Sequence, residues 1–459
     1  MDVLPDDVLL AIFDFYVDSG TIQGKMYIEA WQTLVHVCRR WRCVVFGSPR
    51  RLNLRLVCTP RTPARESLDI WPALPLVVEG SLFSTSADNI IVALGHRDRV
   101  YRIDLLVYGG LEWDRVLAAM RVPFPALTHL LLQTYDQYKD EPESVIPDAF
   151  LGGSAPRLEY LTVGSIPFLG IPNLLMSATH LVNLDFSRIP HFGYISPEVM
   201  ATCLSVLTSL DTLSLGFLSS RSRPDRESRR LPPMTRSILP ALTNFCFNGT
   251  SEYLEDLVAR IDAPRLDFLP ITFLDQINFN TPHTPHLVQF ISRTPSFEEP
   301  NEAHVSFDLS AKAAEVRLLW KSDDNGRLRV KIPYEGSGQQ LPSVTQVCAS
   351  CLPPLSTVEN LRLGVNINSL YSILKWIYGA ESGQWLELLR PFTAVKSLYL
   401  SPYMMSALRA LVGDRTMEVL PSLRNIYLES EESGSFREAI GRFVAARQLS
   451  GHPIAIFYL

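Results

Sequence analysis

Two pairs of residues have the close spacing that metal ligands use. Cys348 and Cys351 are separated by two residues, but the sequence has no second pair of this kind, and zinc needs four ligands. His283 and His286 lie three residues apart, with no cysteine or carboxylate grouped nearby. The cysteines are therefore interpreted as thiols and the histidines as loop residues, and no metal is expected.

A short acidic run at 323–326, Asp-Asp-Asn-Gly, resembles part of a calcium-binding loop. With Asp323 as the third ligand, Lys321 and Ile332 fall at the first and twelfth positions, where carboxylates are required. The sequence also lacks the G-x-S-x-G, Walker A and G-x-G-x-x-G motifs. We therefore expect a chain without catalytic activity and without a cofactor.

Composition indicates a well-packed intracellular protein. Of 459 residues, 47% are hydrophobic and 20% are charged, which favours a large core over disorder. A net charge of −6 argues against nucleic acid as a partner, and no apolar run is long enough to cross a membrane. Seven scattered cysteines and an acidic start, with Asp2, Asp6 and Asp7, favour a reducing compartment over secretion. We expect the cytoplasm or the nucleus.

The elements that remain to be explained begin with two amphipathic segments near the N-terminus. The first has Pro5 in its first turn and an apolar stripe formed by Val8, Leu9, Ile12, Phe13 and Tyr16. The second repeats the spacing with Trp31, Leu34, Val35, Cys38, Trp41 and Val45. Two short helices of this kind cannot bury both faces against each other, so we expect a partner. The alternative is a helical hairpin that caps the following domain.

These residues resemble the F-box, a helical module of ubiquitin-ligase receptors. The likeness rests on the Leu4-Pro5 opening, on Val8-Leu9-x-x-Ile12-Phe13 and on Val37-Cys38-Arg39-Arg40-Trp41. The spacer at 17–27 is longer than usual, and Ser48-Pro49-Arg50-Arg51-Leu52 replaces the final Leu-Trp of many F-boxes.

The resemblance implies a partner, namely the Skp-type adaptor and, through it, a cullin-RING ligase. The residues that it assigns to the adaptor contact, partly against the adaptor and partly against each other, are Leu4, Pro5, Val8, Leu9, Ile12, Phe13, Leu34, Val37, Cys38 and Trp41.

The rest of the chain repeats the pattern Leu-x-x-Leu-x-Leu, with other apolar residues at some positions. It begins at residues 127, 158, 181, 210, 242 and 266, and again at 358, 395 and 423, with spacings of 23 to 37 within each block. Val100 and Leu52 start earlier members. Each repeat predicts a short strand with one buried face. Helix starts follow several strands, at Ser196-Pro197, Ser251-Glu252 and Thr284-Pro285, with later helices expected at 402–412 and 438–449.

Repeated strand, turn and helix is the plan of a leucine-rich repeat. We therefore predict an α/β protein with a small all-α F-box at 1–50 and an irregular leucine-rich-repeat-like solenoid at 51–459. The asparagine that usually ties adjacent turns occurs at the matching place only as Asn366. Asn325-Gly326 lies between two alternating runs and predicts a β-hairpin insertion at about 314–334. The arginine-rich run 221–230 is interpreted as an exposed loop, with a basic docking site as the alternative.

The likeness extends over nearly the whole chain. The phrases at 354–361, 391–396 and 443–451 resemble recurrent phrases of F-box proteins from mushroom-forming fungi. This implies a substrate receptor of a Skp-cullin-F-box ligase whose solenoid holds an unknown target protein; the alternative is a repeat scaffold unconnected with ubiquitin. The target is expected on the strand face, at outward positions between the buried leucines: His129, Tyr160, Asp185, Thr212, Asn244, Phe268, Arg362, Tyr399, Asn425 and Tyr427.

Overall fold

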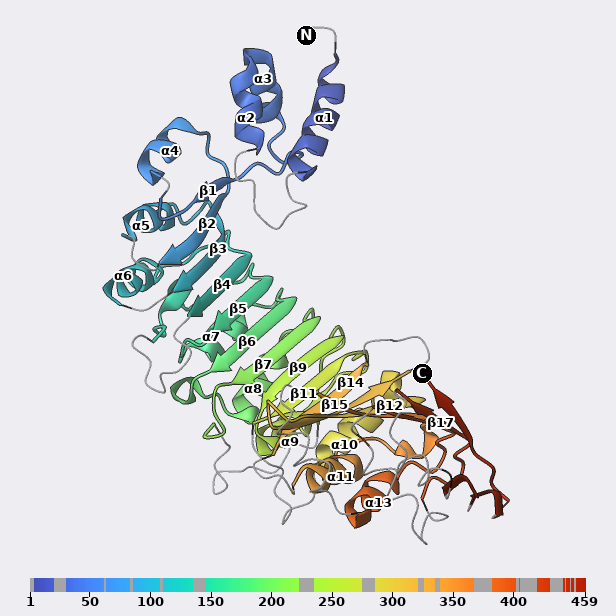
Figure 1. The fold of residues 1–459 in the computed structure, drawn as a ribbon. Coiled ribbons are helices and arrows are strands. Elements are labelled where there is room, and N and C mark those ends of the chain that lie inside the picture. Colours follow the sequence, from blue (N-terminus) through green and yellow to red (C-terminus); the bar gives the residue numbers. More distant parts are fainter. Residues whose placement is uncertain are drawn as a thin grey trace. The chain divides into compact units, whose positions relative to one another are not determined.

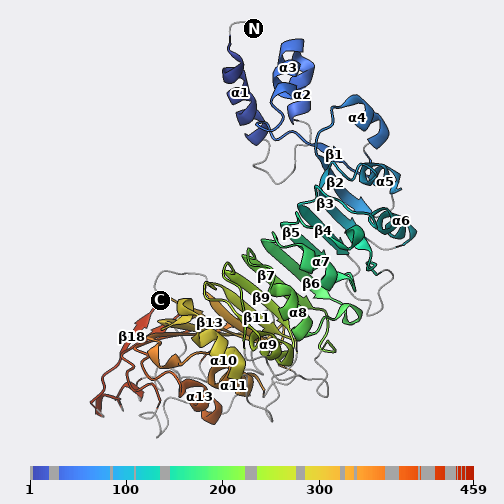
Figure 2. The same cartoon turned by 180° about the vertical axis from the view of Figure 1, so that it is seen from behind.

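The computed structural model divides the chain into two compact units, Met1–Leu181 and Val182–Leu459. In each unit, helices lie along one face of a series of strands (Figures 1 and 2). The described residues are 4–19, 30–61, 63–82, 86–107, 110–134, 145–222, 235–274, 285–320, 326–334, 339–366, 382–401, 404, 419–429, 441, 443–445, 447–449 and 451–459.

Unit 1 begins with three helices, α1 (Asp6–Ser19), α2 (Ala30–Val37) and α3 (Arg39–Gly47). The sequence predicted one helix where α2 and α3 lie, and this was wrong. Cys38 has an extended backbone, with φ of −159°, and its Sγ accepts a hydrogen bond of 3.4 Å from the backbone N–H of Trp41. The thiol thus caps α3 and separates it from α2.

Aromatic contacts join these helices to the start of the repeats. The indole N–H of Trp31 donates to the carbonyl of Arg55 at 3.0 Å. The Trp31 ring meets Trp71 edge to face, with centroids 5.1 Å apart, and Phe46 lies 6.4 Å from the same Trp71 ring. Because Trp31 is only 5% exposed, this cluster belongs to the core of unit 1.

The strands of unit 1 run parallel and pair in chain order. They are β1 (Leu56–Cys58), β2 (Leu76–Leu82), β3 (Val100–Val107), β4 (His129–Thr134) and β5 (Tyr160–Gly164). The connections contain α4 (Ala64–Ile70), α5 (Asp88–Leu94), α6 (Leu111–Ala119), the 3-10 helix η1 (Phe150–Gly153) and, after β5, α7 (Ile171–Ser177). The repeated leucines point inward as predicted, with Leu130, Leu132 and Leu161 at most 1% exposed.

Unit 2 begins with four parallel strands, β6 (Asn183–Ile189), β7 (Thr212–Phe217), β9 (Asn244–Gly249) and β11 (Leu269–Phe273). It ends with β15 (Asn360–Asn366), β16 (Ser397–Leu400), β17 (Asn425–Leu428) and β18 (Ala455–Tyr458), also parallel. Two short strands, β8 (Ser237–Ile238) and β10 (Ile261–Asp262), pair separately.

The two parallel series of unit 2 are joined by an antiparallel segment. It consists of β12 (Glu302–Asp308), β13 (Ala313–Leu319) and β14 (Leu328–Pro333). The antiparallel pair β13 and β14 confirms the predicted hairpin. It is not an appendage, however, because β14 pairs with β11 and β12 pairs with β15, both in parallel.

The helical elements of unit 2 follow the strands in chain order. They are η2 (His191–Gly193), α8 (Pro197–Leu204), α9 (Ser251–Val258), α10 (Pro285–Ser292), η3 (Pro295–Phe297), α11 (Gln340–Ser350), η4 (Leu355–Thr357) and α13 (Ser382–Leu389). Ser196 caps α8, as its sequence predicted, whereas α9 is capped by Thr250, one residue earlier than expected.

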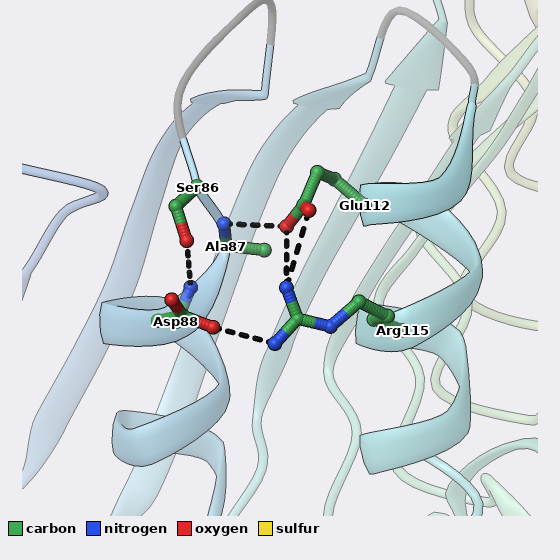
Figure 3. Close-up of polar contacts among 5 residues, drawn as sticks. All are labelled: Ser86, Ala87, Asp88, Glu112 and Arg115. Atoms are coloured by element: carbon green, nitrogen blue, oxygen red, sulfur yellow. Dashed lines mark hydrogen bonds and ion pairs between the residues drawn. The ribbon is translucent and has the colours of Figure 1, made fainter.

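Side chains of adjacent helices accept hydrogen bonds from backbone N–H groups at the helix starts. Asn89 in α5 accepts from the N–H of Ala64 at 3.3 Å, and Glu112 in α6 accepts from the N–H of Ala87 at 2.8 Å. Figure 3 shows how Arg115 then bridges Glu112, at 2.9 Å, and Asp88, at 2.5 Å. These contacts join consecutive helices of unit 1.

Unit 2 uses the same device with a buried carboxylate. Glu255 in α9 is 6% exposed and accepts from the N–H groups of His286, at 2.5 Å, and Leu287, at 3.0 Å. Both N–H groups lie in the first turn of α10, where they have no partner inside the helix.

Several predictions lie outside the described residues. They are the helix at 402–412, apart from Met404, the hairpin turn at 321–325, most of the spacer at 17–27, residues 223–230 of the arginine-rich run, and His283. Of the helix expected at 438–449, residues 441, 443–445 and 447–449 are described and are helical.

Candidate functional site

One face of α1 exposes apolar side chains. Val8, Ile12 and Phe15 are 39%, 48% and 77% exposed, and Leu4 in front of the helix is 44% exposed. Their spacing places them on the same side of the helix. We call these four residues the α1 face. Four exposed apolar side chains at this spacing make the α1 face a candidate interaction surface.

The ten residues that the F-box resemblance assigned to the adaptor divide into three groups by burial. Leu4, Pro5, Val8, Ile12 and Val37 are exposed, with Val37 at 48%. Leu9, Phe13 and Leu34 are buried, and Cys38 and Trp41 are half-buried. The sequence reasoning missed Phe15. It lies seven residues after Val8, which is two helical turns, and this spacing places both residues on one face of the helix.

Two arginines of α3, Arg40 and Arg42, bond to the neighbouring helical segments. Arg40 forms an ion pair of 2.8 Å with Asp6 at the start of α1, and also donates to the carbonyl of Leu4. Arg42 donates through Nε to the carbonyl of Val35 at 3.0 Å. Arg40 therefore links α3 to the segment that carries the α1 face, through an exposed ion pair of the kind that contributes at most about 1 kcal/mol.

The outward positions of unit 1 form a row across the strands. His129 is in register with Arg102 on β3 and with Tyr160 on β5, and its ring stacks on Tyr160 with centroids 4.3 Å apart. A register shift at the start of β3 places Tyr101 beside this row as well. The centre of its ring lies 5.2 Å from the guanidinium of Arg55. Burial, with Arg102 nearby, lowers the pKa of His129.

The first four strands of unit 2 carry a mainly polar row. Thr212 is in register with Asn244, which bridges to Phe268, so three of the predicted positions lie side by side. Asp185 belongs to the next row, beside Ser214, and burial raises the pKa of its carboxyl group.

The last strands of unit 2 carry an aromatic row. Arg362, Tyr399, Tyr427 and Phe457 are register partners on β15 to β18. Tyr399 and Tyr427 stack with centroids 4.5 Å apart, and Tyr427 and Phe457 stack at 5.0 Å. We call these three rings the aromatic ladder. Asn425 lies in the neighbouring row, and Phe457 was not predicted.

The residues considered for chemistry do not form a site in the part of the chain that is described. Cys348 and Cys351 are both buried, and burial, with Cys351 beside it, raises the pKa of Cys348 to about 12. No cluster of three histidine, cysteine or acidic residues suited to a metal occurs among the described residues. Within the same ranges, no helix is long and apolar enough to span a membrane.

The exposed helix face and the succession of strand and helix define an α/β protein with N-terminal helices and a leucine-rich-repeat-like array. No family model matches the sequence, and no curated protein matches it. Among solved structures, the chain is similar to the leucine-rich repeat-containing protein LegL7 from Legionella pneumophila. The identity is 14% and the TM-score is 0.26, over 85% of this chain and 97% of that chain.

Proposed function

We propose that this chain is the substrate receptor of a Skp-cullin-F-box ubiquitin ligase. The observation that carries the proposal is the α1 face, whose four apolar side chains are each at least 39% exposed. The resemblance of the same helices to the F-box supports a Skp-type adaptor as the protein that covers this face. An exposed apolar face suits a stable protein contact.

In this proposal the N-terminal residues have separate tasks. The residues that contact the adaptor, because they are exposed, are Leu4, Pro5, Val8, Ile12, Phe15 and Val37. The buried side chains, Leu9, Phe13 and Leu34, hold the three helices together. The half-buried Cys38 and Trp41 contribute both to the adaptor contact and to the packing of the three helices.

The repeats hold a target protein near the ligase. Binding of both proteins to one chain makes ubiquitin transfer effectively intramolecular and raises the local concentration of the target. The chain itself then needs neither catalytic residues nor a cofactor. The role requires a reducing compartment, the cytoplasm or the nucleus, in agreement with seven scattered cysteines.

The double variant Val8→Asp/Ile12→Asp tests the adaptor contact. Burying uncompensated carboxylates costs several kcal/mol each, on the order of a hundredfold or more in affinity, so the adaptor should no longer co-purify. Leu111→Asp is the matched control, since Leu111 is 82% exposed on α6, outside the α1 face. Both variants should melt like the wild type, and adaptor binding by the folded double variant refutes the contact.

A repeat scaffold unconnected with ubiquitin is the alternative. It predicts that the wild-type chain recovers target proteins but no Skp-type adaptor or cullin. Mass spectrometry of proteins that co-purify with the wild type and with the double variant separates the two functions.

A further inference from the structure

We propose that Arg362 and the aromatic ladder bind an extended peptide with an anionic side chain followed by apolar residues. The assignment rests on the proposed role of the strand face in target recognition and specifies the chemistry of that target.

The guanidinium of Arg362 is held by one hydrogen bond and one ring contact, and its two Nη groups face no acceptor among the described residues. Its Nε donates to Glu302 at 2.7 Å, and its guanidinium lies 4.3 Å from the centre of the Tyr399 ring. The side chain is 45% exposed. Within the described residues, the two Nη nitrogens have no hydrogen-bond partner, so a planar pair of donors is available to a carboxylate or a phosphate.

The carboxylate beside Arg362 is already shared. Oε1 of Glu302 also contacts Nε2 of His304, at 2.6 Å, so the carboxylate is held by two partners. Burial opposes ionisation of Glu302, but the hydrogen bonds from His304 and Arg362 lower its pKa overall. Glu302 therefore remains charged and orients the guanidinium.

The surrounding row is basic. Register places Arg329, Arg317, His304 and Arg362 on the consecutive strands β14, β13, β12 and β15. Glu315 pairs with Arg317 at 2.9 Å. Three guanidinium groups in one row, with two carboxylates at their side, attract an anionic partner to this part of a chain that is acidic as a whole.

The ladder sets the length of the peptide. From Arg362 to Phe457 the row crosses three strand spacings, about 14 Å, which an extended peptide spans in about four residues. Phe457 is 43% exposed and offers an apolar contact at the far end. The expected segment therefore has an anionic residue and then apolar or aromatic residues within the next four positions.

Fluorescence anisotropy with the full chain tests this assignment. The probes are labelled twelve-residue peptides with a fixed glutamate, phosphoserine or glutamine, followed by four positions varied among leucine, tyrosine, proline and serine. Peptides with an anion should bind about tenfold or more tightly than those with glutamine, since charge-assisted hydrogen bonds are stronger than the neutral hydrogen bonds that glutamine can form. The difference between the glutamate and phosphoserine arms identifies the source of the anion.

Arg362→Gln should abolish the preference for the anion. Arg390→Gln, which removes the same charge at an exposed position directly after α13, should retain it. Phe457→Ala, a truncation at an exposed position, should abolish the preference for apolar residues. This variant still tests the assignment if Arg362→Gln does not fold. Equal binding in the three peptide arms, or an anion preference that survives in folded Arg362→Gln, overturns the assignment. Adaptor binding by the wild-type chain is measured in parallel. No adaptor binding refutes the receptor proposal. Adaptor binding together with equal affinity for the three kinds of peptide refutes only the peptide assignment.

Discussion

The ring of Phe13 in α1 meets the indole of Trp41 in α3 edge to face, with the centroids 4.8 Å apart. Phe13 is fully buried, while Ile12 beside it is 48% exposed. Adjacent residues of one helix therefore have different tasks: one holds the helices together and the other is available to a partner.

Phe13→Ala should lower the free energy of unfolding by about 3–5 kcal/mol, because it removes a buried ring and leaves a cavity. Ile12→Ala should change it by less than about 0.5 kcal/mol. Urea denaturation followed by tryptophan fluorescence measures both. Equal losses in the two variants show that α1 does not pack as described.

Glu255→Ala should destabilise the protein by about 1–3 kcal/mol, because two N–H groups at the start of α10 lose their acceptor. The control is Glu252→Ala on the same helix, at a half-buried position whose side chain accepts a hydrogen bond of 3.4 Å from the hydroxyl of the neighbouring Ser251. Its effect should stay below about 0.5 kcal/mol. Thermal and urea unfolding of the two variants decide whether the carboxylate of Glu255 joins α9 to α10.

His129 should make the protein less stable in mild acid. Its pKa in the folded chain lies below the usual 6.5, through burial and then through Arg102. The unfolded chain therefore takes up the proton first, so stability decreases as the pH falls from about 6.5 towards the folded pKa. His129→Asn should show a smaller loss of unfolding free energy between about pH 7 and pH 5. Identical pH profiles contradict this contribution.

The cysteines should differ in their reaction with iodoacetamide. Cys43 is exposed and should be alkylated in the native protein, whereas Cys348 and Cys351 are buried and should react only after unfolding. The high pKa of Cys348 acts in the same direction, since the thiolate is the reactive form. Peptide mapping by mass spectrometry measures each site. Added zinc should leave the melting temperature unchanged, and a rise in that temperature contradicts the interpretation as thiols.

The repeated strands follow directly from local sequence. In Leu127-x-x-Leu130-x-Leu132 the alternation itself specifies a strand and its buried face, so β4 and the strands like it were predicted. β12 also alternates, with Ala303, Val305 and Phe307 buried, but it lacks the leucine anchor and was missed. β2 begins with the continuous apolar run at 76–78. Such a run has no alternation of buried and exposed positions, so the period of two does not identify it as a strand.

The candidate surfaces depend on tertiary contacts, which the periodicity of a sequence does not determine. The stripe on α1 was visible, yet Leu9 is buried and Val8 is exposed because α2 and α3 pack on only one side of it. The break at Cys38 depends on a thiol that caps a helix, for which there was no sequence signal. The stacking of Tyr399 on Tyr427 requires that β16 and β17 be neighbours in register.

Titration of purified Skp-type adaptor into the purified chain, by calorimetry, tests the central proposal most directly. The account predicts binding of the wild type with a Kd below about 1 µM, and no measurable heat with folded Val8→Asp/Ile12→Asp. Absence of binding by the folded wild type at concentrations of about 100 µM contradicts the receptor function.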